Sequence, residues 1–112
     1  MTEHAVLDAR AAAARLADGA ILLDVREDDE WAAGHAPRAR HAPLGQLAVH
    51  LRTLSADGVF VVVCRSGSRS ARAQAELLQA GRRAINLDGG MRAWSDAGLP
   101  VVHDDGSPGT VI

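Results

Sequence analysis

The sequence contains a single cysteine, no lysine, no tyrosine and few other aromatic residues. One cysteine in 112 residues cannot form an internal disulfide and cannot belong to a metal site built from several thiolates. It also excludes a redox centre in which a second cysteine of the same chain resolves the first. All 12 basic residues are arginine. Together with the abundant alanine and glycine, this indicates a compositional bias of the source genome.

Long apolar runs and an excess of charge of one sign are also missing. No apolar stretch approaches the roughly 20 residues of a membrane helix, and residues 1–5 lack the basic and apolar segments of a secretory signal. The formal net charge is −2, and the arginines are interspersed with acidic residues, so no basic stripe indicates nucleic-acid binding. We therefore expect a cytoplasmic protein without a membrane or nucleic-acid partner.

What is present is the composition of one globular domain, with 47% hydrophobic and 23% charged residues. Predicted strands alternate with predicted helices. The strands are expected at 6–7, 20–25, 40–42, 59–63 and 84–87. The helices are expected between the N-cap Asp8 and Gly19, from the N-cap Asp28 to Ala33, weakly over 44–51, and at 69–79 and 91–97. The alternation predicts an α/β fold, a small parallel sheet flanked by helices on both faces. Residues 1–102 would form the domain and 103–112 a loose polar tail.

The clearest pattern is the apolar strand 59–63, which leads directly into Cys64 and then into a helix. This arrangement places the thiol at a helix N-terminus, where free N–H groups and the helix dipole favour negative charge. Small residues at Ser66, Gly67 and Ser68 let the backbone N–H groups converge into an anion-binding nest. Arg65 and Arg69 are expected to add positive charge. Cys64 is therefore predicted to be a thiolate nucleophile with a lowered pKa.

A buried cysteine followed by an ordinary Ser/Gly turn is the simpler interpretation. The two arginines and the absence of apolar neighbours after the cysteine argue against it. The same nest would hold the terminal sulfur of a persulfide, which is also anionic, without a metal or an organic cofactor.

Four motifs, which occur along the chain in the order typical of the family, resemble the rhodanese family. The resemblance covers about Val6 to Val102. Besides the loop Cys64–Ser70 they are Leu22-Leu23-Asp24-Val25-Arg26, Trp31-Ala32-Ala33-Gly34-His35-Ala36-Pro37 and Asp88-Gly89-Gly90-Met91-Arg92-Ala93-Trp94. The resemblance implies a rhodanese-like three-layer sandwich and a sulfurtransferase activity. It identifies Cys64 as the sulfur-accepting nucleophile and the backbone from Arg65 to Arg69 as the sulfur pocket.

The remaining motif residues are assigned supporting roles by the same resemblance. Arg69 and Ser70 would close the loop, and Asp24 and Arg26 would support it from a strand end, although Asp24 could also be only a polar strand-end group. His35 is expected to have a structural hydrogen-bonding role, without an obvious carboxylate partner. Gly89-Gly90 is expected to be a backbone requirement and Trp94 a core residue. Arg38 is a departure, because the family commonly has glycine there.

Two other functions remain as alternatives. A phosphatase or arsenate reductase would also use a Cys…Arg loop, but such loops have five intervening residues, whereas four separate Cys64 from Arg69. A non-catalytic binding module is the second alternative. For the sulfurtransferase, the expected partners are a donor such as thiosulfate, favoured by the cationic Arg65, and a thiophilic acceptor such as cyanide, a small thiol or a protein cysteine. The chain is expected to be a monomer or a weak homodimer.

Overall fold

The computed structural model describes residues 5–112. Residues 1–4, predicted to belong to the domain and to carry no secretory signal, lie outside the described part. Within residues 5–112, no helix combines the length and the apolar character needed to cross a membrane.

Five parallel strands form one sheet in the order β1-β5-β4-β2-β3. Their bounds are Val6–Leu7 (β1), Ile21–Asp24 (β2), Arg40–His41 (β3), Val59–Val63 (β4) and Arg83–Leu87 (β5). In the register, Val62 of β4 lies between Leu23 of β2 and Asn86 of β5. The central position of β4 explains its uninterrupted apolar sequence, because both of its faces are covered.

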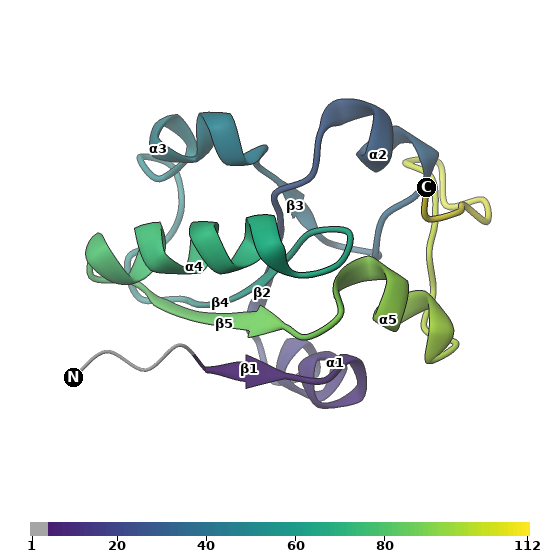
Figure 1. Cartoon of the computed structure of the whole chain (residues 1–112), viewed down its shortest axis with the longest axis horizontal. Helices are drawn as coiled ribbons and strands as arrows, with labels where there is room; N and C mark the ends of the chain where they lie inside the picture. Colours follow the sequence, from purple (N-terminus) through teal and green to yellow (C-terminus); the bar gives the residue numbers. More distant parts are fainter. Residues whose placement is uncertain (1–4) are drawn as a thin grey trace.

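Helices cover both faces of the sheet, as predicted (Figure 1). Their bounds are Ala9–Ala17 (α1), Asp28–Ala33 (α2), Leu47–His50 (α3, preceded by a 3-10 turn at Leu44–Gln46), Ser68–Gln79 (α4) and Gly90–Asp96 (α5). Alternate residues of β4 enter different cores. Phe60 and Val62 pack in the cluster with Leu77 of α4, whereas Val61 and Val63 pack in the cluster that contains residues of α1 and α5. The period of two along the strand therefore assigns the helices to opposite layers.

Most element boundaries agree with the sequence prediction, and one cap differs. Asp8 caps α1 by accepting the N–H of Ala11 at 2.8 Å, as expected. The N-cap of α2 is Glu27 rather than Asp28, which is the first residue of the helix. Glu27 and Glu30 form a capping box, in which each side chain accepts the other residue's backbone N–H. A glutamate at the cap can use this reciprocal arrangement, which the preference for aspartate did not anticipate.

The prediction of a loose tail at 103–112 is wrong. The segment folds back, so that the N–H of Gly109 donates to Val101 O and the N–H of Thr110 donates to Ala33 O, both at 2.9 Å. Gly34 and Gly109 allow this approach, since a Cβ on Gly109 would lie 2.8 Å from the Cα of Gly34. Val111 also packs against the apolar cluster on the α1 and α5 side of the sheet. Polar composition suggested looseness, but backbone hydrogen bonds and the packing of Val111 hold the segment. Figure 1 shows it folded back near α2 and α5.

Candidate active site

Cys64 lies at the carboxyl end of the central strand, where ligands bind in open α/β sheets. Its backbone is fixed by the start of α5, because the N–H of Met91 donates to Cys64 O at 2.8 Å and the N–H of Arg92 donates to Arg65 O at 3.1 Å. Gly90 has a φ of +63°, and a Cβ there would collide with the backbone of Cys64 and Arg65. Gly89 also has a positive φ, of +77°, so the predicted backbone requirement is met at both glycines where α5 meets the loop.

The thiol of Cys64 is buried and surrounded by hydrogen-bond donors. The N–H of Gly67 donates to Sγ at 3.0 Å, and the hydroxyl of Ser70 lies 3.3 Å from it. Burial raises the pKa of the thiol, but the Ser70 hydroxyl and the backbone N–H groups of Ser70, Gly67 and Ser66 together hold the pKa of Cys64 below its ordinary value. These donors belong to the first turn of α4, which begins at Ser68, and to the residues before it. The loop can therefore stabilise a sulfur anion with backbone dipoles.

The two loop arginines have protein partners of their own. Arg69 makes a two-pronged ion pair with Glu30 of α2, at 2.7 and 2.8 Å, and this hydrogen bonding lowers the pKa of Glu30 to about 2. Arg65 donates from Nε to the backbone oxygen of Ile112 at 2.9 Å. The charge of Arg69 still interacts favourably with the Cys64 thiolate, while its guanidinium is held by Glu30. Hydrogen bonds lower the thiol pKa, while Arg69 connects the loop to α2.

Sequence reasoning missed Asn86, which completes the hydrogen bonding beneath the loop. Its side-chain oxygen lies 2.6 Å from the hydroxyl of Ser70, and its amide donates to Gly67 O at 3.2 Å. Since a hydroxyl carries one proton, Ser70 can donate to only one of three acceptors at a time: Asn86 Oδ1, Gly67 O or the Cys64 thiolate. In the sequence, Asn86 stands out only as a polar side chain between the apolar residues of β5. The order of the strands in the sheet is what places it below the loop.

Asp24 and Arg26 form a fully buried ion pair with a distance of 2.8 Å. Arg26 also donates to the backbone oxygens of Gly34 at 2.8 Å and Glu30 at 3.3 Å. Because Arg26 precedes α2 and its guanidinium binds the oxygen of Gly34 just after α2, the pair connects the two ends of this helical segment. Within the described residues the hydrogen bonds of this pair reach Glu30 of α2 and Gly34 just after it, but not the Cys64 loop. α2 in turn contacts the loop through Glu30 and Arg69.

His35 has the carboxylate partner that the sequence did not reveal. Its Nε2 lies 2.8 Å from Asp104, and its Nδ1 lies 3.0 Å from Ala36 O. The ring also stacks on Trp31 with a centroid distance of 3.7 Å. Asp104 belongs to the segment predicted to be loose, so the partner became visible only with the fold.

The hydrogen bond from Ser70 to the thiolate has a measurable consequence. In Ser70→Ala the pKa of Cys64 should rise, because the thiolate loses a donor while the thiol loses little. The pH profile of alkylation by iodoacetamide should move to higher pH, with slower alkylation at neutral pH.

Ser68→Ala is the matched control for that measurement. Ser68 is an exposed serine in the same turn, and its hydroxyl makes no recorded hydrogen bond to the sulfur within the described residues. Its profile should coincide with wild type. Coincident profiles for both variants would remove Ser70 from the tuning of the thiol.

Among residues 5–112 no three His, Cys, Asp or Glu side chains converge as a metal-ligand set would require. The donors around Cys64 are instead N–H and O–H groups, which suit an anion.

The fold is an α/β domain with a parallel sheet and a cysteine in a loop of N–H donors at the end of its central strand. The profile of the rhodanese-like domain matches residues 8–97, and this chain belongs to that family.

Individual relatives agree with this membership. The chain is 38% identical to the Sulfurtransferase of Allochromatium vinosum, over 89% of this chain and 96% of that protein. It is 40% identical to YtwF of Bacillus subtilis, whose name describes it as a candidate sulfurtransferase, over 70% of this chain and 77% of that one. A rhodanese-related protein from Thermoplasma volcanium superposes with a TM-score of 0.80 at 31% identity, covering 88% of this chain and 97% of that chain.

Proposed function

We propose that this protein is a sulfurtransferase that carries sulfane sulfur as a persulfide on Cys64. The observation that carries the proposal is the thiol itself, buried at the start of α4 with the N–H of Gly67 3.0 Å from Sγ and a lowered pKa. A relative whose name is Sulfurtransferase, similar over 96% of its length, supports it.

The reaction proposed is a double displacement. The Cys64 thiolate attacks the outer sulfur of thiosulfate, a new S–S bond forms, and sulfite leaves with the electron pair of the broken bond. A thiophilic acceptor then attacks the terminal sulfur and the Cys64 thiolate is regenerated. The backbone N–H groups of the loop would stabilise the anion in both states, which makes a metal or an organic cofactor unnecessary. Small thiols of the reducing cytoplasm are the acceptors we favour, with a protein cysteine as an alternative.

Intact mass spectrometry tests the persulfide step directly. After brief incubation with thiosulfate, the protein should gain one sulfur atom, and dithiothreitol should remove it. Because the chain has one cysteine, prior alkylation with iodoacetamide blocks a single thiol and should prevent the gain. A gain only with 3-mercaptopyruvate or a small persulfide would retain the mechanism and change the donor. No gain with any of these donors would reject the sulfurtransferase and favour a binding module.

Arg65 is the residue proposed to favour a dianionic donor. Only its Nε is engaged, by the oxygen of Ile112, so the terminal guanidinium nitrogens can contact thiosulfate at the entrance of the loop. Arg65→Gln should raise the KM for thiosulfate by about tenfold and change kcat much less, since one hydrogen bond to a charged group is lost.

The matched control for this prediction is Arg72→Gln. Arg72 is an exposed residue of α4, so its KM should remain that of wild type. An unchanged KM in Arg65→Gln would end the assignment of donor choice to this side chain.

A further inference from the structure

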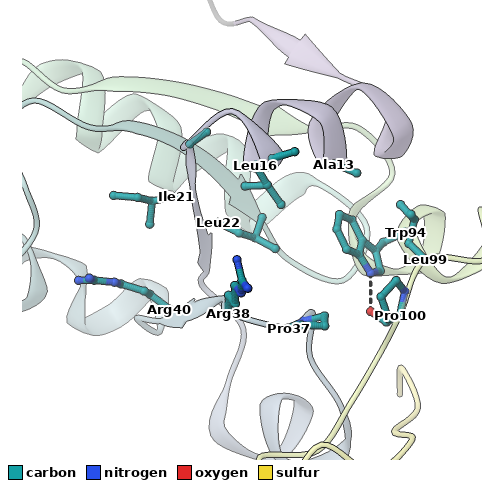
Figure 2. Close-up of a pocket in the computed structure, with 12 residues that line it drawn as sticks. Ala13, Leu16, Ile21, Leu22, Pro37, Arg38, Arg40, Trp94, Leu99 and Pro100 are labelled. Atoms are coloured by element: carbon teal, nitrogen blue, oxygen red, sulfur yellow. Dashed lines mark hydrogen bonds between the residues drawn. The ribbon is translucent and has the colours of Figure 1, made fainter.

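A concave site lies away from Cys64, on the face of the sheet covered by α1 and α5. Its volume is about 480 Å³, within the range of small-molecule sites. Figure 2 shows the residues that line it, namely Ala13, Leu16, Ala17, Ala20, Ile21, Leu22, Pro37, Arg38, Arg40, Trp94, Leu99 and Pro100. They come from α1 and the chain up to the first half of β2, from the segment before β3 with its first residue, and from α5 with its following loop. The cavity therefore does not use the loop at the carboxyl edge of the sheet.

The wall of this cavity is apolar and fixed. Leu22 and Trp94 are buried in the core cluster, and Leu16 and Leu99 pack against it. Trp94 cannot turn freely, because its indole N–H donates to Pro100 O at 2.8 Å. A rigid apolar wall loses little conformational entropy when an apolar chain binds to it.

The rim carries positive charge. Arg38 and Arg40 are exposed, and within residues 5–112 their guanidinium groups make no recorded hydrogen bond or ion pair, in contrast to the paired Arg26 and Arg69. In Figure 2 the side chain of Arg38 points from the lower segment toward Leu22, whereas the side chain of Arg40 extends to the left, away from Arg38.

The backbone of Arg38 is also unusual. Its φ is +64°, and it is the one non-glycine residue with positive φ among residues 5–112. A long side chain in this conformation costs energy that glycine would not. Strain of this kind persists where the surrounding structure enforces it, and it is frequent at ligand sites. Here it coincides with a guanidinium directed at the cavity.

We propose that this cavity binds a small amphipathic carboxylate, namely an unbranched fatty acid of medium chain length. The alkyl chain would lie against Leu16, Leu22 and Trp94, and the carboxylate would accept hydrogen bonds from Arg38. The planar guanidinium matches the two oxygens of a carboxylate, and Arg40 adds a second positive charge elsewhere on the rim. Neutral chains lack the partner for Arg38, and cationic amphiphiles are repelled.

Decanoate, used below its micelle concentration, is the probe for a nitrogen-15 amide NMR titration of the complete chain. The expected result is saturable shifts of amides around Leu16, Leu22, Arg38 and Leu99. Decanol should bind at least tenfold more weakly, because it lacks the charge. Shortening the acid should weaken binding about three- to fourfold for each methylene removed. Equal binding of decanol and decanoate, or shifts concentrated elsewhere, would overturn the proposal.

Three Arg→Gln variants test whether decanoate binds at this cavity or responds only to the positive charge of the protein surface. Arg38→Gln should weaken decanoate binding by about tenfold, since it removes one charged hydrogen-bond donor. Arg40→Gln should weaken it a fewfold, and Arg52→Gln, an exposed arginine outside the cavity, should leave it unchanged. Equal effects of Arg38→Gln and Arg52→Gln would contradict the proposal. So would shifts at the same amides that depend on protein concentration alone, since a second copy of the chain would then be the occupant.

These experiments do not use Cys64. Mass spectrometry measures sulfur loading of Cys64, and NMR measures decanoate binding. The proposed function and the proposed binding site can therefore be rejected independently.

Discussion

Replacing Cys64 with serine should abolish persulfide formation and reduce sulfur transfer to cyanide by at least about a thousandfold. Serine preserves the shape of the side chain and can still accept the N–H of Gly67. Its hydroxyl stays protonated under conditions in which the loop ionises a thiol, and oxygen cannot carry sulfane sulfur as a persulfide. Intact mass after thiosulfate treatment and the rate of thiocyanate formation would measure the two effects.

The stability of the same variants provides the control. Cys64→Ser should unfold within about 1 kcal/mol of wild type, because the buried donors keep an acceptor. Cys64→Ala should be equally inactive but less stable, since the N–H of Gly67 then loses its partner. Sulfur transfer by Cys64→Ser above about one per cent of wild type would mean that another group is the nucleophile.

Replacing Asp24 with alanine should lower the free energy of unfolding by about 3–5 kcal/mol. The side chain is fully buried and accepts four hydrogen bonds from Arg26, one from its backbone N–H and three from its guanidinium. Without the carboxylate, the guanidinium would remain buried with only backbone oxygens as partners. Because small domains are stable by about 5–15 kcal/mol, this loss is a large fraction of the total. Urea unfolding would measure it from the midpoint and the slope.

Two further variants make this prediction decisive. Asp24→Asn keeps one acceptor without the charge, so its stability should lie between those of wild type and Asp24→Ala, and it can be measured if the alanine variant does not fold. Asp28→Ala removes an acid whose side chain is 94% exposed, and it should change stability by less than about 0.5 kcal/mol. A loss below about 1 kcal/mol in Asp24→Ala would show that the buried pair contributes little to the fold.

The local pattern of the sequence predicted the central part of the site because the relevant groups are contiguous. A run of apolar β-branched residues predicts the buried strand β4, and the small residues after Cys64 predict the turn into α4. The donors to the sulfur come from Ser66, Gly67 and Ser70, all within six residues of the cysteine. Backbone geometry over such a short distance depends on local preferences, so the lowered pKa of the thiol could be anticipated.

The partners of the loop could not be anticipated because they come from distant segments. Glu30 pairs with Arg69 across 39 residues, Asn86 reaches Ser70 across 16, and Asp104 reaches His35 across 69. Nothing in their local sequence distinguishes Glu30 or Asp104 from ordinary surface acids.

The sequence by itself determined the alternation of strands and helices, the central apolar strand and the placement of Cys64 in a loop whose N–H groups lower the pKa of its thiol. Periodicity, capping and turn preferences are properties of neighbouring residues, and they act before the chain is compact. Only the tertiary structure decided that Arg69 is paired with Glu30 of α2, that the 103–112 segment is held in place, and that Arg38 faces an apolar cavity. These outcomes depend on which distant groups meet when the sheet forms, and the strand order sets that.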